Sequence, residues 1–119
     1  MDSYRDLLVW KAAIELAVRC YEVTKGFPQA EAYGMTSQIR RASASIAANI
    51  AEGHGRDGTA SFIQFLRIAQ GSLKELETHL ILAQRVALVG ETDMIPIMGQ
   101  CDEIGRMLRS LIRSLQSKT

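Results

Sequence analysis

Several features that mark common classes of protein are scarce or missing in this sequence. The 119 residues include only two Cys and two Pro, and the longest run without a charged side chain covers residues 42–51. A helix that spans a bilayer needs about 20 apolar residues, so we expect no membrane partner. The first residues show no basic segment followed by an apolar run and a small-residue cleavage site, and this absence argues against a secretory signal. We therefore expect a cytoplasmic protein.

The two cysteines and the charge balance narrow the class further. Cys20 and Cys101 lie far apart in the chain, as expected of buried thiols in a reducing compartment and not of a disulfide framework. The net charge is only +1, which excludes the strong overall cationic field of a general phosphate-binding protein. The chain is 47% hydrophobic and 23% charged, an ordinary globular composition, and its length suits one domain over residues 1–119.

Apolar residues recur at steps of three and four in four segments, and alternating patterns typical of strands are scarce. We predict helices over about residues 7–25, 35–52, 59–89 and 93–117, ended by Gly or Pro. Asp6 is the expected cap of the first helix, and Pro96 is expected within the first turn of the fourth. The fold class is then all-α, an antiparallel up-and-down four-helix bundle.

Helices one and three carry more apolar surface than one bundle needs. The core face predicted for helix one is Leu7, Trp10, Ile14, Val18 and Tyr21. The surplus on helix one is Val9, Ala13, Leu16, Cys20 and Val23, and on helix three it is Ile63, Ile68, Ile81, Leu82 and Leu88. We expect self-association through these two helices, so that the chain is a homo-oligomer. The alternative is that both helices lie deep in an asymmetric bundle.

Motifs that would support catalysis or a cofactor are weak. The glycines of residues 53–58 match the spacing of a dinucleotide-binding fingerprint, but they follow a helix and no strand precedes them. Glu75 and His79 share a helical face, yet a di-iron bundle needs several such pairs on separate helices. We predict no catalytic residue, no metal and no cofactor, and hence a protein that is not an enzyme.

Helix two carries a polar stripe beside its apolar face. Its members are Gln38, Arg41, Ser45, Asn49 and Glu52. Several alanines surround the stripe, so that another helix can approach closely. We expect a half-buried interhelical network that fixes helix register. The alternative is a recognition surface built from Arg41 and Asn49.

Arginines form a second polar pattern, centred on helix four. Arg106, Arg109 and Arg113 recur at steps of three and four, where like charges repel unless something neutralises them. The ordinary reading is a favourable interaction with the helix dipole, with Asp102 pairing to Arg106. The functional reading adds the arginines of the second helix and the following loop, so that the candidate nucleic-acid or subunit contacts are Arg40, Arg41, Arg56, Arg106, Arg109 and Arg113.

Three stretches together resemble the bacterial 23S rRNA-intervening sequence protein family. They are DLLVWKA at residues 6–12, YGMTSQIRRA at 33–42 with NIAEG at 49–53, and FIQFLRIAQGSL at 62–73. The resemblance implies a small cytoplasmic bacterial four-helix bundle, and a ring-shaped homopentamer as its assembly. It also relates the chain to accessory proteins of diversity-generating retroelements, which bind nucleic acid through a basic surface. The family offers no agreed catalytic residues.

We therefore predict a self-assembling, non-enzymatic scaffold that engages another macromolecule. The alternative is an RNA- or DNA-binding accessory protein that acts through its arginine stripes. The even charge count favours assembly over RNA.

Overall fold

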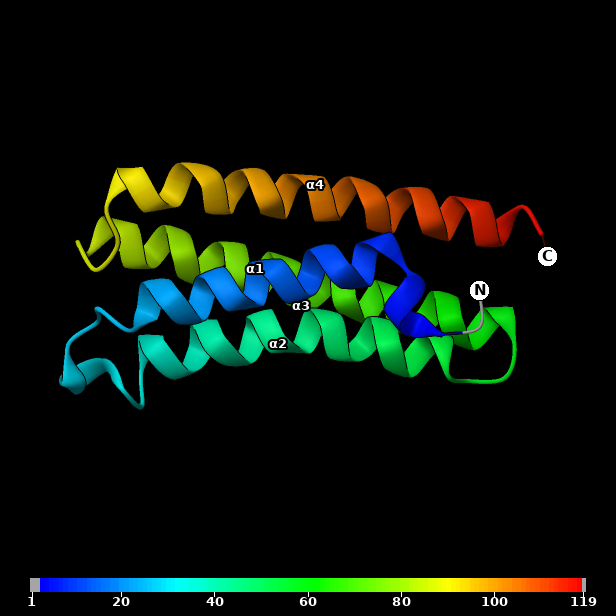
Figure 1. Ribbon diagram of the computed structural model, residues 1–119, viewed down its shortest axis with the longest axis horizontal. Helices are drawn as coiled ribbons and strands as arrows, with labels where there is room; N and C mark the ends of the chain where they lie inside the picture. Colours follow the sequence, from blue (N-terminus) through cyan, green and yellow to red (C-terminus); the bar gives the residue numbers. More distant parts are fainter. Residues whose placement is uncertain (1–2, 119) are drawn as a thin grey trace.

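Four long helices lie antiparallel to one another in the computed structural model, which describes residues 3–118 (Figure 1). They are α1 (Leu8–Thr24), α2 (Met35–His54), α3 (Thr59–Arg85) and α4 (Glu91–Gln116). Two short 3₁₀ turns, η1 (Tyr4–Asp6) and η2 (Gln29–Glu31), precede α1 and α2. Each helix packs against the next and α4 packs against α1, which closes a bundle of 47 × 23 × 20 Å. This confirms the antiparallel up-and-down four-helix bundle, and none of residues 3–118 forms a strand.

The start of α1 differs from the prediction. Asp6 lies inside η1 and does not cap α1, whose first flanking residue is Leu7, with no side-chain capping bond. The capping interaction occurs one element earlier, where Ser3 Oγ accepts a hydrogen bond from the Arg5 amide at 3.1 Å. The extra turn is stabilised by Tyr4, whose ring packs edge-on against Trp10 at 5.2 Å.

The predicted end of α3 at residue 89 is also wrong. The helix stops at Arg85, and Ala87 adopts the left-handed conformation with φ 66°. The Leu88 amide then donates to the Ala83 carbonyl at 2.8 Å, a closure that ends many helices, usually with glycine at the left-handed position. The nearby glycine, Gly90, serves instead as the residue that flanks the start of α4.

Helix α4 starts at Glu91, two residues before the predicted start, and this shifts Pro96 into its second turn. Proline cannot donate to the carbonyl of Thr92, four residues earlier. The helix continues because Thr92 and Pro96 both lie on its exposed side, where water can satisfy that carbonyl.

Helices α2 and α4 bury residues that recur at steps of three and four, as helical spacing predicts, whereas most of the core face predicted for α1 is wrong. Helix α1 buries four of the five residues that were expected to be surplus, namely Val9, Ala13, Leu16 and Cys20. Of the predicted core face, Leu7 is buried and Trp10 packs partly against the core, but Ile14, Val18 and Tyr21 are exposed. Apolar residues cover more than half of this helix, so spacing alone cannot choose the buried arc. The arc with small residues faces inward, where it permits close packing.

Helices α2 and α3 make the closest approach in the bundle. A Cβ at Gly53 would lie 2.6 Å from the Cβ of Phe65 and 3.2 Å from Cδ1 of Phe62. Only glycine fits this crossing. No helix within residues 3–118 combines the length and apolarity that a bilayer crossing requires.

Candidate functional site

An apolar surface lies along α1, next to the alanine-rich side of α2. Ile14, Val18 and Tyr21 are 37%, 54% and 43% exposed. On α2, which packs against α1, Ala44 and Ala48 are also exposed, and their side chains are small. We call these five residues the α1/α2 apolar surface. Exposed apolar patches on a protein surface are common sites of contact with another molecule.

Arg40 fixes the α1/α2 apolar surface in place. Its Nε donates to Thr24 Oγ1 at 2.9 Å, and its guanidinium lies 4.6 Å from the centre of the Tyr21 ring. Thr24 Oγ1 in turn donates to the Cys20 carbonyl at 2.7 Å. This arginine, a candidate contact for phosphates or subunits, is thus used to tie α2 to the end of α1.

A second group of exposed apolar residues lies on α3. Ile68, Ile81 and Leu82 are each nearly half exposed, and we call them the α3 apolar residues. Beside Ile68 lies an open hollow of about 400 Å³, which Ala60, Ile63, Gln64 and Arg67 also line. Ile63 and Leu88, two further members of the predicted surplus, pack partly against the core instead.

The polar stripe of α2 is divided by the structure. Ser45 and Asn49 come together with Ser72 of α3: the two serine hydroxyls lie 2.9 Å apart, and Asn49 Nδ2 lies 3.0 Å from Ser45 Oγ. Gln38 and Arg41 are exposed and take no part in these hydrogen bonds. Glu52 forms an ion pair with Arg56 instead. The half-buried contact between α2 and α3 therefore consists of short side chains and contains no ion pair.

The other candidate arginine near the second helix, Arg56, also has a partner within the chain. It forms an ion pair with Glu52 at 2.8 Å and lies 5.0 Å from the centre of the Phe65 ring. Both charged side chains are about half exposed, so the pair is solvated.

The three candidate arginines of α4 form no ion pair within residues 3–118, a state they share with other exposed cations such as Arg19 and Arg67. Arg106, Arg109 and Arg113 are all exposed, and no carboxylate of the described chain lies within ion-pair distance of them. The expected pair between Asp102 and Arg106 does not form. Repulsion among the three guanidinium groups is therefore left to solvent or to a partner.

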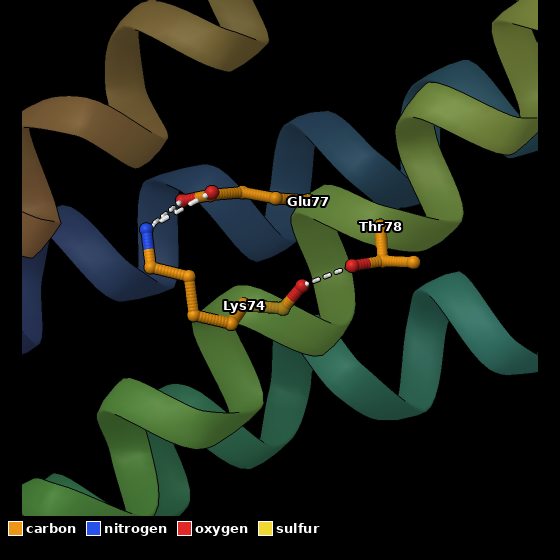
Figure 2. Close-up of polar contacts among 3 residues, drawn as sticks. All are labelled: Lys74, Glu77 and Thr78. Atoms are coloured by element: carbon orange, nitrogen blue, oxygen red, sulfur yellow. Dashed lines mark hydrogen bonds and ion pairs between the residues drawn. The ribbon is translucent and has the colours of Figure 1, made fainter.

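A carboxylate of the adjacent helix is used in a different pair. Besides burial, the charge of Glu77 on α3 contributes to the raised pKa of Cys101 on α4. Glu77 Oε1 pairs with Lys74 Nζ at 3.1 Å (Figure 2). Figure 2 also shows Thr78 Oγ1 donating to the Lys74 carbonyl, at 2.8 Å, on the same helix. Glu77 is thus paired with a lysine of its own helix.

A groove that the sequence analysis missed runs between the start of α1 and the second half of α4. It encloses about 500 Å³, and its lining is mostly apolar with Arg106 at its edge: Leu7, Leu8, Val9, Arg106, Met107, Ser110, Leu111 and Ser114. Leu8 is 69% exposed at its rim. An exposed leucine in the first turn of a helix was the only sequence signal, because the groove depends on how two distant segments pack.

The groups with catalytic potential are inactive or scattered. Burial raises the pKa of the Cys20 and Cys101 thiols to about 12, so both are protonated at neutral pH. Within residues 3–118, no three side chains of the metal-ligating types gather into a site. His54 packs edge-on against Phe62 at 5.7 Å, which gives it a structural contact at the end of α2.

Comparison with known proteins gives the family. The model of the 23S rRNA-intervening sequence protein family matches residues 5–110. A crystal structure of a protein of unknown function from the S23 ribosomal protein family of Bacteroides thetaiotaomicron is similar, with a TM-score of 0.82 and 31% sequence identity. The alignment covers 89% of this chain and 96% of that one. The search of curated proteins found no match. The chain belongs to the 23S rRNA-intervening sequence protein family.

Proposed function

We propose that this protein is a self-assembling, non-enzymatic scaffold of the bacterial cytoplasm. The observation that carries the proposal is the α1/α2 apolar surface, which exposes Ile14, Val18 and Tyr21 on one rigid face. Covering these side chains with another subunit removes apolar area from water, the main driving force for association.

The α3 apolar residues give the assembly a second contact. A two-fold dimer uses one surface on both subunits, whereas a closed ring joins two different surfaces of neighbouring subunits. The α1/α2 apolar surface supplies one such surface, and the adjacent residues Ile81 and Leu82 of α3 supply a second. This arrangement supports a ring, and the family resemblance favours a pentamer.

The chemistry of the cysteines supports a role without catalysis. A thiol attacks as the thiolate, and a pKa of about 12 leaves almost none of that form at neutral pH. A scaffold needs no such group.

The test changes the apolar surface and measures the mass of the protein in solution. In Val18→Asp, a charge replaces the most exposed of the three α1 residues in the α1/α2 apolar surface, and we expect the assembly to dissociate to a 13.2 kDa chain. The matched control is Tyr33→Asp, since Tyr33 is 99% exposed outside this surface. An unchanged mass for Val18→Asp, or equal dissociation by the control, contradicts the proposal.

A second candidate function is binding of RNA or DNA. It is favoured by the three α4 arginines, which are exposed and lack carboxylate partners. If they contact phosphates, affinity must fall steeply with salt, because binding releases counterions. Titration with RNA and duplex DNA at about 50 mM salt is the most favourable condition, and no binding there removes this candidate.

A further inference from the structure

The outer face of α4 is divided into an acidic half and a basic half. Six exposed residues recur along it at steps of three, four or seven, so they lie on one line: Glu91, Ile95, Asp102, Arg106, Arg109 and Arg113. We call this line the α4 stripe. Figure 1 shows α4 at the edge of the bundle, with α1 and α3 on its inner side.

The charges of the α4 stripe are complementary to those of a second α4 stripe that runs in the opposite direction. In an antiparallel pair of α4 helices, Glu91 lies level with Arg113 of a second copy, and Asp102 lies near Arg106. The two pairings do not fit a single register perfectly. In the register midway between them, each pair is displaced by about 3 Å along the helix axis, a distance that an arginine side chain can span. Ile95, 67% exposed, then falls on the aliphatic stem of Arg109.

We propose that the α4 stripe is a contact surface for a second copy of this chain, paired antiparallel about a two-fold axis. Every pair then occurs twice, and the contact closes on itself without forming a fibre. The proposal rests on the proposed self-assembly and adds a contact on a different face from the apolar surfaces.

The charge pattern favours a second copy over nucleic acid as the occupant. Phosphates are uniformly negative, so a strand that follows the α4 stripe would meet Asp102 and Glu91 after the arginines. The helix dipole explains acids in the first turn and bases in the last turn only. Asp102 and Arg106 lie in the middle of α4, outside its reach.

The contact is weak and sensitive to salt, because all its charges are exposed. Exposed ion pairs contribute little singly and are screened over about 10 Å at 0.1 M salt. We expect association through the α4 stripe to weaken by about tenfold between roughly 0.05 M and 0.5 M salt.

Two charge-reversal variants test the pairing directly. The first, Glu91→Arg/Asp102→Arg, makes the α4 stripe basic throughout, and the second, Arg106→Glu/Arg113→Glu, makes it largely acidic. Each variant should bind itself at least about tenfold more weakly than the native chain does, and the two mixed should bind each other at least about tenfold more tightly than either binds itself. The measurement is fluorescence anisotropy of one labelled variant titrated with the other.

Matched controls separate pairing from attraction by net charge. Glu22→Arg/Glu75→Arg and Arg19→Glu/Lys25→Glu reverse the same number of exposed charges away from the α4 stripe. If these controls bind each other as tightly as the α4 variants do, the proposal is overturned. The proposal is also overturned if the two α4 variants, when mixed, fail to associate. This holds even if the native arginines are found to bind RNA.

The test of the α4 contact does not depend on assembly through the apolar surfaces. Repeating the titration in the Val18→Asp background leaves the α4 stripe intact. If Val18→Asp does not change the mass of the protein, the proposed function fails, whereas tight binding between the two α4 variants would still support the α4 contact.

Discussion

Replacing Gly53 by alanine should destabilise the bundle, although alanine is the better helix former. The new Cβ would lie 2.6 Å from the Cβ of Phe65 and 3.3 Å from the Phe62 carbonyl oxygen. Carbon atoms in contact prefer about 3.5–4.0 Å, so α2 and α3 must separate by about 1 Å. Neither obstructing atom is the end of a flexible side chain that can turn aside.

The magnitude follows from two opposing effects. Alanine gains about 1 kcal/mol in helix propensity, while overpacking in a close interface costs about 1–3 kcal/mol. Because the clash involves a Cβ and a backbone oxygen, the cost lies at the upper end. We expect a net loss of about 2 kcal/mol, or roughly 8 °C in Tm for a chain of this size.

Gly71 supplies the matched control. It lies inside α3, and a Cβ there meets nothing within 4 Å. Gly71→Ala should therefore raise Tm by a few degrees through helix propensity alone. Thermal unfolding followed by circular dichroism, at one protein concentration, measures both variants. If Gly53→Ala raises Tm as Gly71→Ala does, the close approach of α2 and α3 is refuted.

Two further predictions concern Arg40 and the thiols. Arg40→Met should lower the free energy of unfolding by about 1–2 kcal/mol, because the hydrogen bond to Thr24 and the contact with Tyr21 are lost; an unchanged urea midpoint contradicts this. The Cys20 and Cys101 thiols should react with a disulfide reagent only after unfolding. Because their folded pKa of about 12 exceeds the ordinary 9.0, they contribute stability that is complete below pH 9 and lost as pH rises toward 12. This part of the loss should be absent from Cys20→Ala/Cys101→Ala.

The helices and most of the core could be predicted from the sequence, because amphipathic spacing reports directly on burial. For α2 and α4 the apolar stripe is narrow, and the buried residues follow its steps of three and four. For α1 the apolar arc is wide, and the choice of buried side depends on its neighbours. The end of α3 was missed because Ala87 takes a conformation that composition assigns to glycine.

The arginines show why the candidate site was harder to predict. Arg40 and Arg56 belong to the same positive pattern in the sequence as the α4 arginines, yet both have partners in the fold. Arg40 reaches Thr24, sixteen residues earlier, across a loop whose path the sequence does not reveal. Packing decides which of the six candidate arginines find a partner within the described chain, and the α4 set and Arg41 do not.

Self-assembly through exposed apolar surfaces can be measured as the mass of the native chain in solution. Sedimentation velocity over a range of concentrations, in about 0.5 M salt so that the α4 contact is screened, should show a species several times 13.2 kDa, reduced to the single chain in Val18→Asp. Salt should not dissociate this species, because the α1/α2 apolar surface is uncharged. A single 13.2 kDa species at every concentration would contradict the account.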